Sequence, residues 1–162
     1  MAYQSVHHYP YPLRATLPRW LIVGFVAGFV SVLLFHQGVA ALLHALNFTP
    51  RAPYSLQPTQ PLGVPVITSI AFWGGVWGVL LAAALARLDG ARLIVAATIF
   101  GVIFPTLVAW FVVAPLKGNP VAGGFAPAAM LIGPIVNGAW GLGTGIGLAL
   151  WGRPRAGRTR PA

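Results

Sequence analysis

The stretch 126–151, APAAMLIGPIVNGAWGLGTGIGLALW, decides the fold because it carries no charged residue over its whole length. An apolar helix of this length can cross the hydrocarbon core of a bilayer. Small residues recur in it at every fourth position, which places them on one side of the helix: Asn137, Gly141, Gly145 and Ala149. Because lipid is as apolar as leucine, membrane helices associate through close backbone approach at such residues. The stretch therefore predicts a spanning helix that packs closely against a neighbour.

An earlier stretch, 69–87, repeats this pattern as SIAFWGGVWGVLLAAALAR. Its small residues also recur at every fourth position: Gly74, Gly78, Ala82 and Ala86. A shift of 63 positions places these residues on the later stripe and also aligns Trp77 with Trp140. Small-residue stripes are common in membrane helices and could recur by chance. Chance recurrence of the stripe does not explain why a tryptophan also occupies the same position in both stretches. We interpret the two stretches as an internal repeat.

The composition is typical of an integral membrane protein, since 57% of the 162 residues are hydrophobic and 7% are charged. The formal net charge is +9, but the basic residues lie between and beyond the apolar runs, where membrane topology requires them. We therefore expect no nucleic-acid partner. The chain has no cysteine and no recognisable catalytic triad, carboxylate pair or metal-ligand cluster. The sequence predicts no enzyme, no catalytic residue and no metal site.

The predicted fold is an all-α integral membrane four-helix bundle, built from two repeated two-helix hairpins if the internal repeat is real. The transmembrane domain covers 19–152, between an N-terminal tail of 1–18 and a basic C-terminal tail of 153–162. The four helices are expected at about 19–46, 65–88, 92–113 and 127–151.

Three features refine the predicted helices. In the first helix, Gly24 and Gly28 have the spacing of a close helix contact, although a cleaved signal peptide is an alternative reading of this run. In the second, Trp77 falls near mid-membrane and is expected to pack inside the bundle. In the third, Pro105 should kink the helix, because it lacks an N–H group.

The basic residues predict the orientation. All of them except Arg51 and Lys117 fall on the side of the bundle that holds both termini. The positive-inside rule places that side in the cytoplasm. We expect a multi-pass protein with both termini cytoplasmic, and the absence of eukaryotic-looking features favours the bacterial cytoplasmic (inner) membrane.

Polar residues inside membrane helices are candidates for function. The candidate polar site consists of His36, Gln37, Ser69 and Asn137. Helix rise places His36 and Ser69 in one layer near the outer boundary, and Asn137 close to the midplane. Haem held by two histidines would need two copies of His36, because the other intramembrane histidine is on the same helix. A quinone contact at His36 is a further alternative.

The predicted function is that of a non-catalytic accessory, assembly or structural subunit without a cofactor. Membrane lipid surrounds it, and it docks through its small-residue faces onto a copy of itself, as a homo-oligomer, or onto a larger membrane complex. The faces expected to pack are Gly24, Gly28, Gly74, Gly78, Ala82, Asn137, Gly141 and Gly145. One alternative is a small channel or transporter with Asn137 in the bundle core; another is a His36-dependent haem or quinone site.

Overall fold

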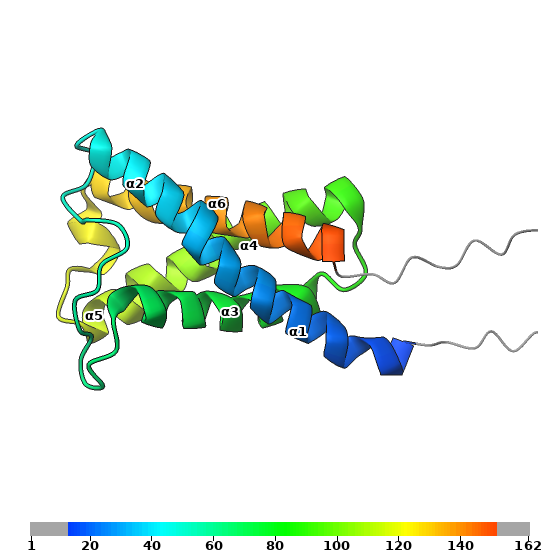
Figure 1. Cartoon of the computed structure of the whole chain (residues 1–162). Helices are drawn as coiled ribbons and strands as arrows, with labels where there is room; N and C mark the ends of the chain where they lie inside the picture. The colour runs from blue at the N-terminus through cyan, green and yellow to red at the C-terminus, as the bar shows by residue number, and fades with distance from the viewer. Residues whose placement is uncertain (1–12, 152–162) are drawn as a thin grey trace, which may run out of the picture.

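The computed structural model describes residues 13–151, and these residues form helices and loops with one isolated β-bridge, between Pro58 and Pro65. Four of the helical segments are long and apolar enough to cross a membrane, and successive segments run antiparallel (Figure 1). The predicted all-α four-helix fold is confirmed, and it is compatible with a multi-pass membrane protein. Most of the N-terminal tail and the whole basic C-terminal tail lie outside the described residues.

The spans have the following bounds. The first consists of α1 (Leu13–Ser31), the π-helix η1 (Val32–His36) and α2 (Gln37–Ala45), and the second is α3 (Val66–Ala84). The third consists of α4 (Gly90–Val108), the π-helix η2 (Ala109–Val113) and α5 (Ala114–Leu116). A short 3-10 helix, η3 (Val121–Phe125), precedes the fourth span, α6 (Pro127–Trp151).

Several helix ends differ from the predicted ranges. The first helix begins at Leu13 rather than near residue 19, so it includes the end of the predicted N-terminal tail. The second span ends at Ala84 rather than near residue 88, because the chain leaves the helix at Leu85 and turns: Leu88 N–H bonds to Leu85 O, three residues back. The third span continues through Pro105 without interruption and extends to Leu116. Its irregular turn is the π-helix η2, which lies just before Pro115, another residue without an N–H group.

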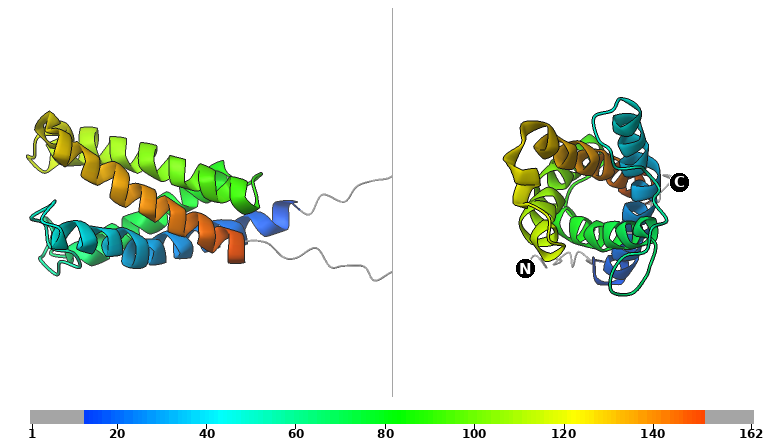
Figure 2. Two further views of the ribbon diagram at one scale, coloured as in Figure 1. Left: turned by 90° about the horizontal axis from the view of Figure 1, so that it is seen from above. Right: turned by 90° about the vertical axis from the view of Figure 1, so that its left-hand side faces the viewer.

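The helices pack as two hairpins, α1 with α3 and α4 with α6 (Figure 2). In addition, α1 packs against α6 and so joins the hairpins, whereas α3 makes few contacts with α4 or α6. The two hairpins therefore pack closely where α1 meets α6 and loosely where α3 meets α4.

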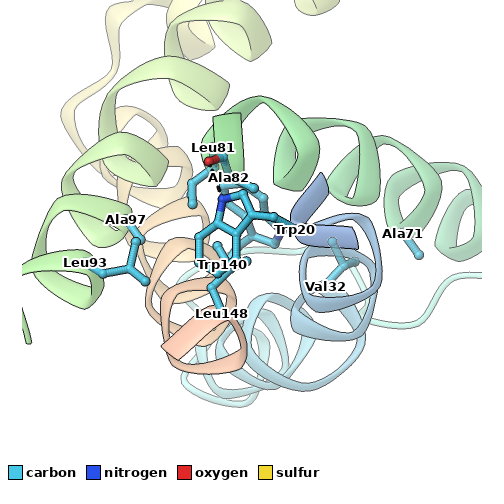
Figure 3. Close-up of a cluster of buried hydrophobic side chains, with 9 residues drawn as sticks. All are labelled: Trp20, Val32, Ala71, Leu81, Ala82, Leu93, Ala97, Trp140 and Leu148. Atoms are coloured by element: carbon cyan, nitrogen blue, oxygen red, sulfur yellow. Dashed lines mark hydrogen bonds between the residues drawn. The ribbon is translucent and has the colours of Figure 1, made fainter. Parts of the chain in front are cut away.

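The hydrophobic core includes two buried tryptophans, Trp20 and Trp140, with leucine and alanine around them (Figure 3). The indole Nε1–H of Trp20 donates to the carbonyl oxygen of Ala82 at 2.7 Å. That carbonyl lies in the last turn of α3, where helical N–H partners run out. Trp20 thus provides a donor for a carbonyl group at the end of α3 and links α3 to α1.

Candidate functional site

The first hairpin is held by glycine on both helices. A Cβ atom added to Gly28 of α1 would collide with the carbonyl oxygen of Gly74, and one added to Gly78 of α3 would collide with that of Gly24. The backbones are therefore close enough for weak Cα–H to carbonyl contacts, which larger residues would prevent. Ala82, one turn further along α3, is buried beside Gly24.

The second hairpin is built in the same way. A Cβ atom at Gly101 of α4 would collide with the carbonyl oxygen of Asn137, and one at Gly141 of α6 would collide with that of Ala97. A Cβ atom at Gly145 would lie 2.8 Å from the Cβ atom of Ala97. Sequence reasoning missed Ala97 and Gly101, although their four-residue spacing was a readable signal.

The two hairpins use the same register. Gly28 meets Gly74 and Gly78, and Gly101 meets the residues 63 positions after these two, Asn137 and Gly141. The residues of the first helices match as well, because Gly24 and Gly28 lie 73 positions before Ala97 and Gly101. The two hairpins therefore match in the residues that make contact as well as in sequence.

Both predicted small-residue stripes are therefore occupied within the chain. The α3 stripe is filled by α1 and the α6 stripe by α4, so neither is open to a partner protein. The last members of the two stripes, Ala86 and Ala149, are exposed and lie beyond these contacts.

A second small-residue stripe on α6, which is not among the predicted packing residues, joins the hairpins. A Cβ atom at Gly143 would collide with Phe35 and with Ser31, and one at Gly147 would lie 2.9 Å from the Cβ atom of Ala27. Its signal was present in the sequence, since these two glycines are also four residues apart.

Hydrogen bonds centred on Trp140 reinforce this contact. Trp140 Nε1–H donates to the carbonyl oxygen of Gly28 on α1 at 2.9 Å. In return, the carbonyl oxygen of Trp140 accepts from Ser31 Oγ at 2.7 Å and from Thr144 Oγ1 at 2.8 Å. Ser31, Trp140 and Thr144 are all buried, so these bonds lie in an apolar environment where an unmet polar group would be costly.

The polar residues His36 and Gln37 form a network with a loop residue. The backbone N–H of Tyr54 donates to Gln37 Oε1 at 2.6 Å, and Gln37 Nε2 lies 3.2 Å from His36 Nδ1. Since a backbone N–H can only donate, the oxygen of the Gln37 amide must face Tyr54, and its NH₂ group must face His36. His36 Nδ1 then accepts, and the neutral ring carries its proton on Nε2.

This tautomer bears on the haem alternative. A histidine that ligates a metal through Nε2 carries its proton on Nδ1 and donates it to a neighbouring acceptor. Gln37 offers His36 Nδ1 a donor instead. The network therefore favours a His36 that presents an N–H group at Nε2 over one that ligates iron there.

The other two residues of the candidate polar site lie elsewhere. Asn137 Nδ2 donates to Thr106 Oγ1 at 3.0 Å, which places its amide in the contact between α6 and α4. Ser69 is half-buried on α3, and within residues 13–151 no hydrogen bond joins it to His36 or Gln37. The predicted set is thus divided into a His36–Gln37 pair, a hairpin contact at Asn137 and a separate Ser69.

Replacing Gln37 with Leu should loosen the loop between α2 and α3. The Tyr54 N–H would lose its acceptor, and the net contribution of one such hydrogen bond is about 0.5–1.5 kcal/mol. We expect faster hydrogen exchange across residues 47–65 in the detergent-solubilised full chain. Gln57→Leu is the matched control, because Gln57 is exposed in the same loop. Equal exchange rates in the two variants would contradict the role assigned to Gln37.

Over the part of the chain that the structure describes, no three histidine, aspartate or glutamate side chains gather as metal ligands. Comparisons with protein-family models, with curated proteins and with solved structures give no match.

Proposed function

We propose that the chain is a non-catalytic accessory or assembly subunit, which acts by packing against other proteins in the membrane. The observation that carries this proposal is that the buried polar side chains inside the spans form hydrogen bonds within the chain. Ser31, Thr144 and Asn137 bond across or along helices, and within residues 13–151 no buried side-chain N or O atom lacks a partner. A site for catalysis or transport needs polar groups directed at a substrate.

The proposed setting is the bacterial inner membrane, with both termini in the cytoplasm. In the described residues, Arg87 and Arg92 flank the turn at the end of the bundle where α1 begins and α6 ends, while Arg51 and Lys117 lie in the loops at the opposite end. This distribution supports the orientation, since basic residues are favoured on the cytoplasmic side.

We also propose that the bundle arose by duplication of a two-helix unit. The shared register of the two hairpins supports it, because the counterparts of Gly28, Gly74 and Gly78 meet one another in the second hairpin. Two units in the same orientation are related by an axis along the membrane normal.

The size of the protein in its native membrane tests the accessory role. After extraction of the native membrane into lipid nanodiscs, the protein mass in each disc, with the scaffold and lipid subtracted, is expected to be well above the 17.0 kDa of one copy and to include another protein. A single copy that leaks ions or solutes in proteoliposomes, with the leak lost in Asn137→Ala, would contradict the accessory role. That outcome would support the channel alternative.

A further inference from the structure

One face of α3 is exposed except at Trp77, which is half-buried, although its counterpart on α6 is buried. We call Trp73, Trp77, Leu80 and Ala84 the α3 outer face; their spacing places them on one side of the helix. The residues 63 positions later on α6 are Val136, Trp140, Gly143 and Gly147, and all four are buried. On the α3 outer face, in contrast, Trp73 is 58% and Leu80 is 49% exposed.

The contact made by α6 shows what such a face binds. Trp140 donates its indole N–H to a backbone carbonyl of α1, and Gly147 packs on Ala27. The helix bound there presents small residues four positions apart, Ala27 and Ser31, and the carbonyl that accepts belongs to the residue between them, Gly28. The partner of this face is thus a helix with small residues and an accessible carbonyl.

The corresponding donor on α3 has no acceptor among the described residues. Trp77 is half-buried and meets Phe100 edge-to-face, with ring centroids 6.0 Å apart. Its Nε1–H makes no hydrogen bond within residues 13–151. At 1.5 Å per residue, Trp77 lies about 16 Å along α3 from Val66, near the middle of a hydrocarbon core of about 30 Å. Water and lipid ester groups lie outside that layer, so an unmet N–H there is costly.

The helix α4 fills this position only in part, through the contact of Phe100 with Trp77, because its residues are too large for a close backbone approach. The counterparts of Ala27 and Ser31, 73 positions later, are Phe100 and Phe104. Their rings keep α4 from approaching α3 as α1 approaches α6. A second copy of the chain offers no better partner, since the exposed side chains in the middle of its described spans are also large, as at Val26, Ile99 and Ile103.

We propose that the α3 outer face binds a transmembrane helix of another protein. That helix carries small residues spaced as Ala27 and Ser31 are, and it presents a backbone carbonyl to Trp77 Nε1. The proposal rests on the accessory role proposed above and specifies the surface and the kind of partner that this role requires.

A synthetic peptide of residues 18–45 serves as the probe, because it contains the helix that Trp140 already binds. The chain has no cysteine, so Ala84→Cys in the full chain and Ala27→Cys in the peptide form a defined pair. Their positions reproduce the contact between Gly147 and Ala27. In lipid vesicles under mild oxidation, the disulfide is expected to form with a saturable dependence on peptide concentration.

Removing the donor while keeping an aromatic ring should weaken this binding. We expect Trp77→Phe to raise the peptide concentration for half-saturation by about three- to tenfold, the effect of one intramembrane hydrogen bond. Trp151→Phe is the matched control, because Trp151 is exposed at the end of α6. On the chain with Trp77 intact, a peptide with Ser31→Leu should crosslink poorly, which tests the face independently of the folding of the Trp77 variant.

Equal half-saturation in the Trp77 and Trp151 variants, or equal crosslinking by the Ser31→Leu peptide, would overturn the proposal. Disulfides formed only between two copies of the Ala84→Cys chain would overturn it as well, in favour of self-association. Peptide binding as expected, together with a chain that is monomeric in native nanodiscs, would refute the accessory role but support the assignment of the face.

Discussion

Gly78→Leu is expected to abolish pairing of α1 with α3, whereas Gly38→Leu should leave the fold intact. Even a Cβ atom at Gly78 would collide with the backbone of Gly24, while one at Gly38 meets nothing within 4 Å. Overpacking a well-packed core costs about 1–3 kcal/mol, and here the obstacle is main chain, which cannot move as a side chain can. The two helices must therefore separate.

The measurements are the yield of monodisperse protein in mild detergent and its thermal unfolding curve. Gly78→Leu, and Gly141→Leu for the second hairpin, are expected to aggregate without a cooperative transition. Gly38→Leu is the control, because it raises helix propensity as much as these variants do without creating a collision. If Gly78→Leu melts at the same temperature as Gly38→Leu, the close contact assigned to the first hairpin is wrong.

The sequence predicted the four helices, because long uncharged apolar runs leave few alternatives in a membrane protein. It also located the small-residue stripes, but not the helices that fill them. A stripe at Gly74 and Gly78 indicates a close neighbour without identifying it. The neighbour is decided by matching small residues, and those of the second hairpin, Ala97 and Gly101, become informative only when set beside Gly24 and Gly28.

The candidate polar site shows a different limit. Helix rise gives the depth of a residue but not the side of the helix on which it lies once the winding changes. In η1 the N–H of Gln37 bonds to Val32 O, five residues back, so Gln37 sits above Val32 and His36 above Ser31. A regular α-helix would place them differently. Tyr54, which completes the network, lies in a loop, where no periodic pattern identifies contacts.

The contact between α1 and α6 leads to the second large expected effect. Gly143→Leu should part the two hairpins while leaving each hairpin paired. Its side chain would collide with Phe35 and Ser31, and the bond from Ser31 Oγ to Trp140 O would be lost. The other side of the bundle shows the effect of a leucine at this position. Leu80 of α3 is equivalent to Gly143, and α3 makes few contacts with α4.

Distances between spin labels can measure the separation, since introduced cysteines have no background in this chain. Labels at Val26 and Leu142 report on α1 and α6, and their mean distance should grow by about 2–4 Å as the helices move to ordinary packing distances. Labels at Ile22 and Leu80, within the first hairpin, should keep their distance.

Ala149→Leu is the control for the Gly143 variant, because Ala149 is exposed on the same helix. If both variants leave the Val26–Leu142 distance unchanged, small residues do not set the contact between α1 and α6. The difference between the close contact of α1 with α6 and the loose contact of α3 with α4 would then need another cause. The contact of α1 with α6 would also no longer indicate what kind of helix binds the α3 outer face. A longer distance in Gly143→Leu alone would show that one glycine holds the hairpins together.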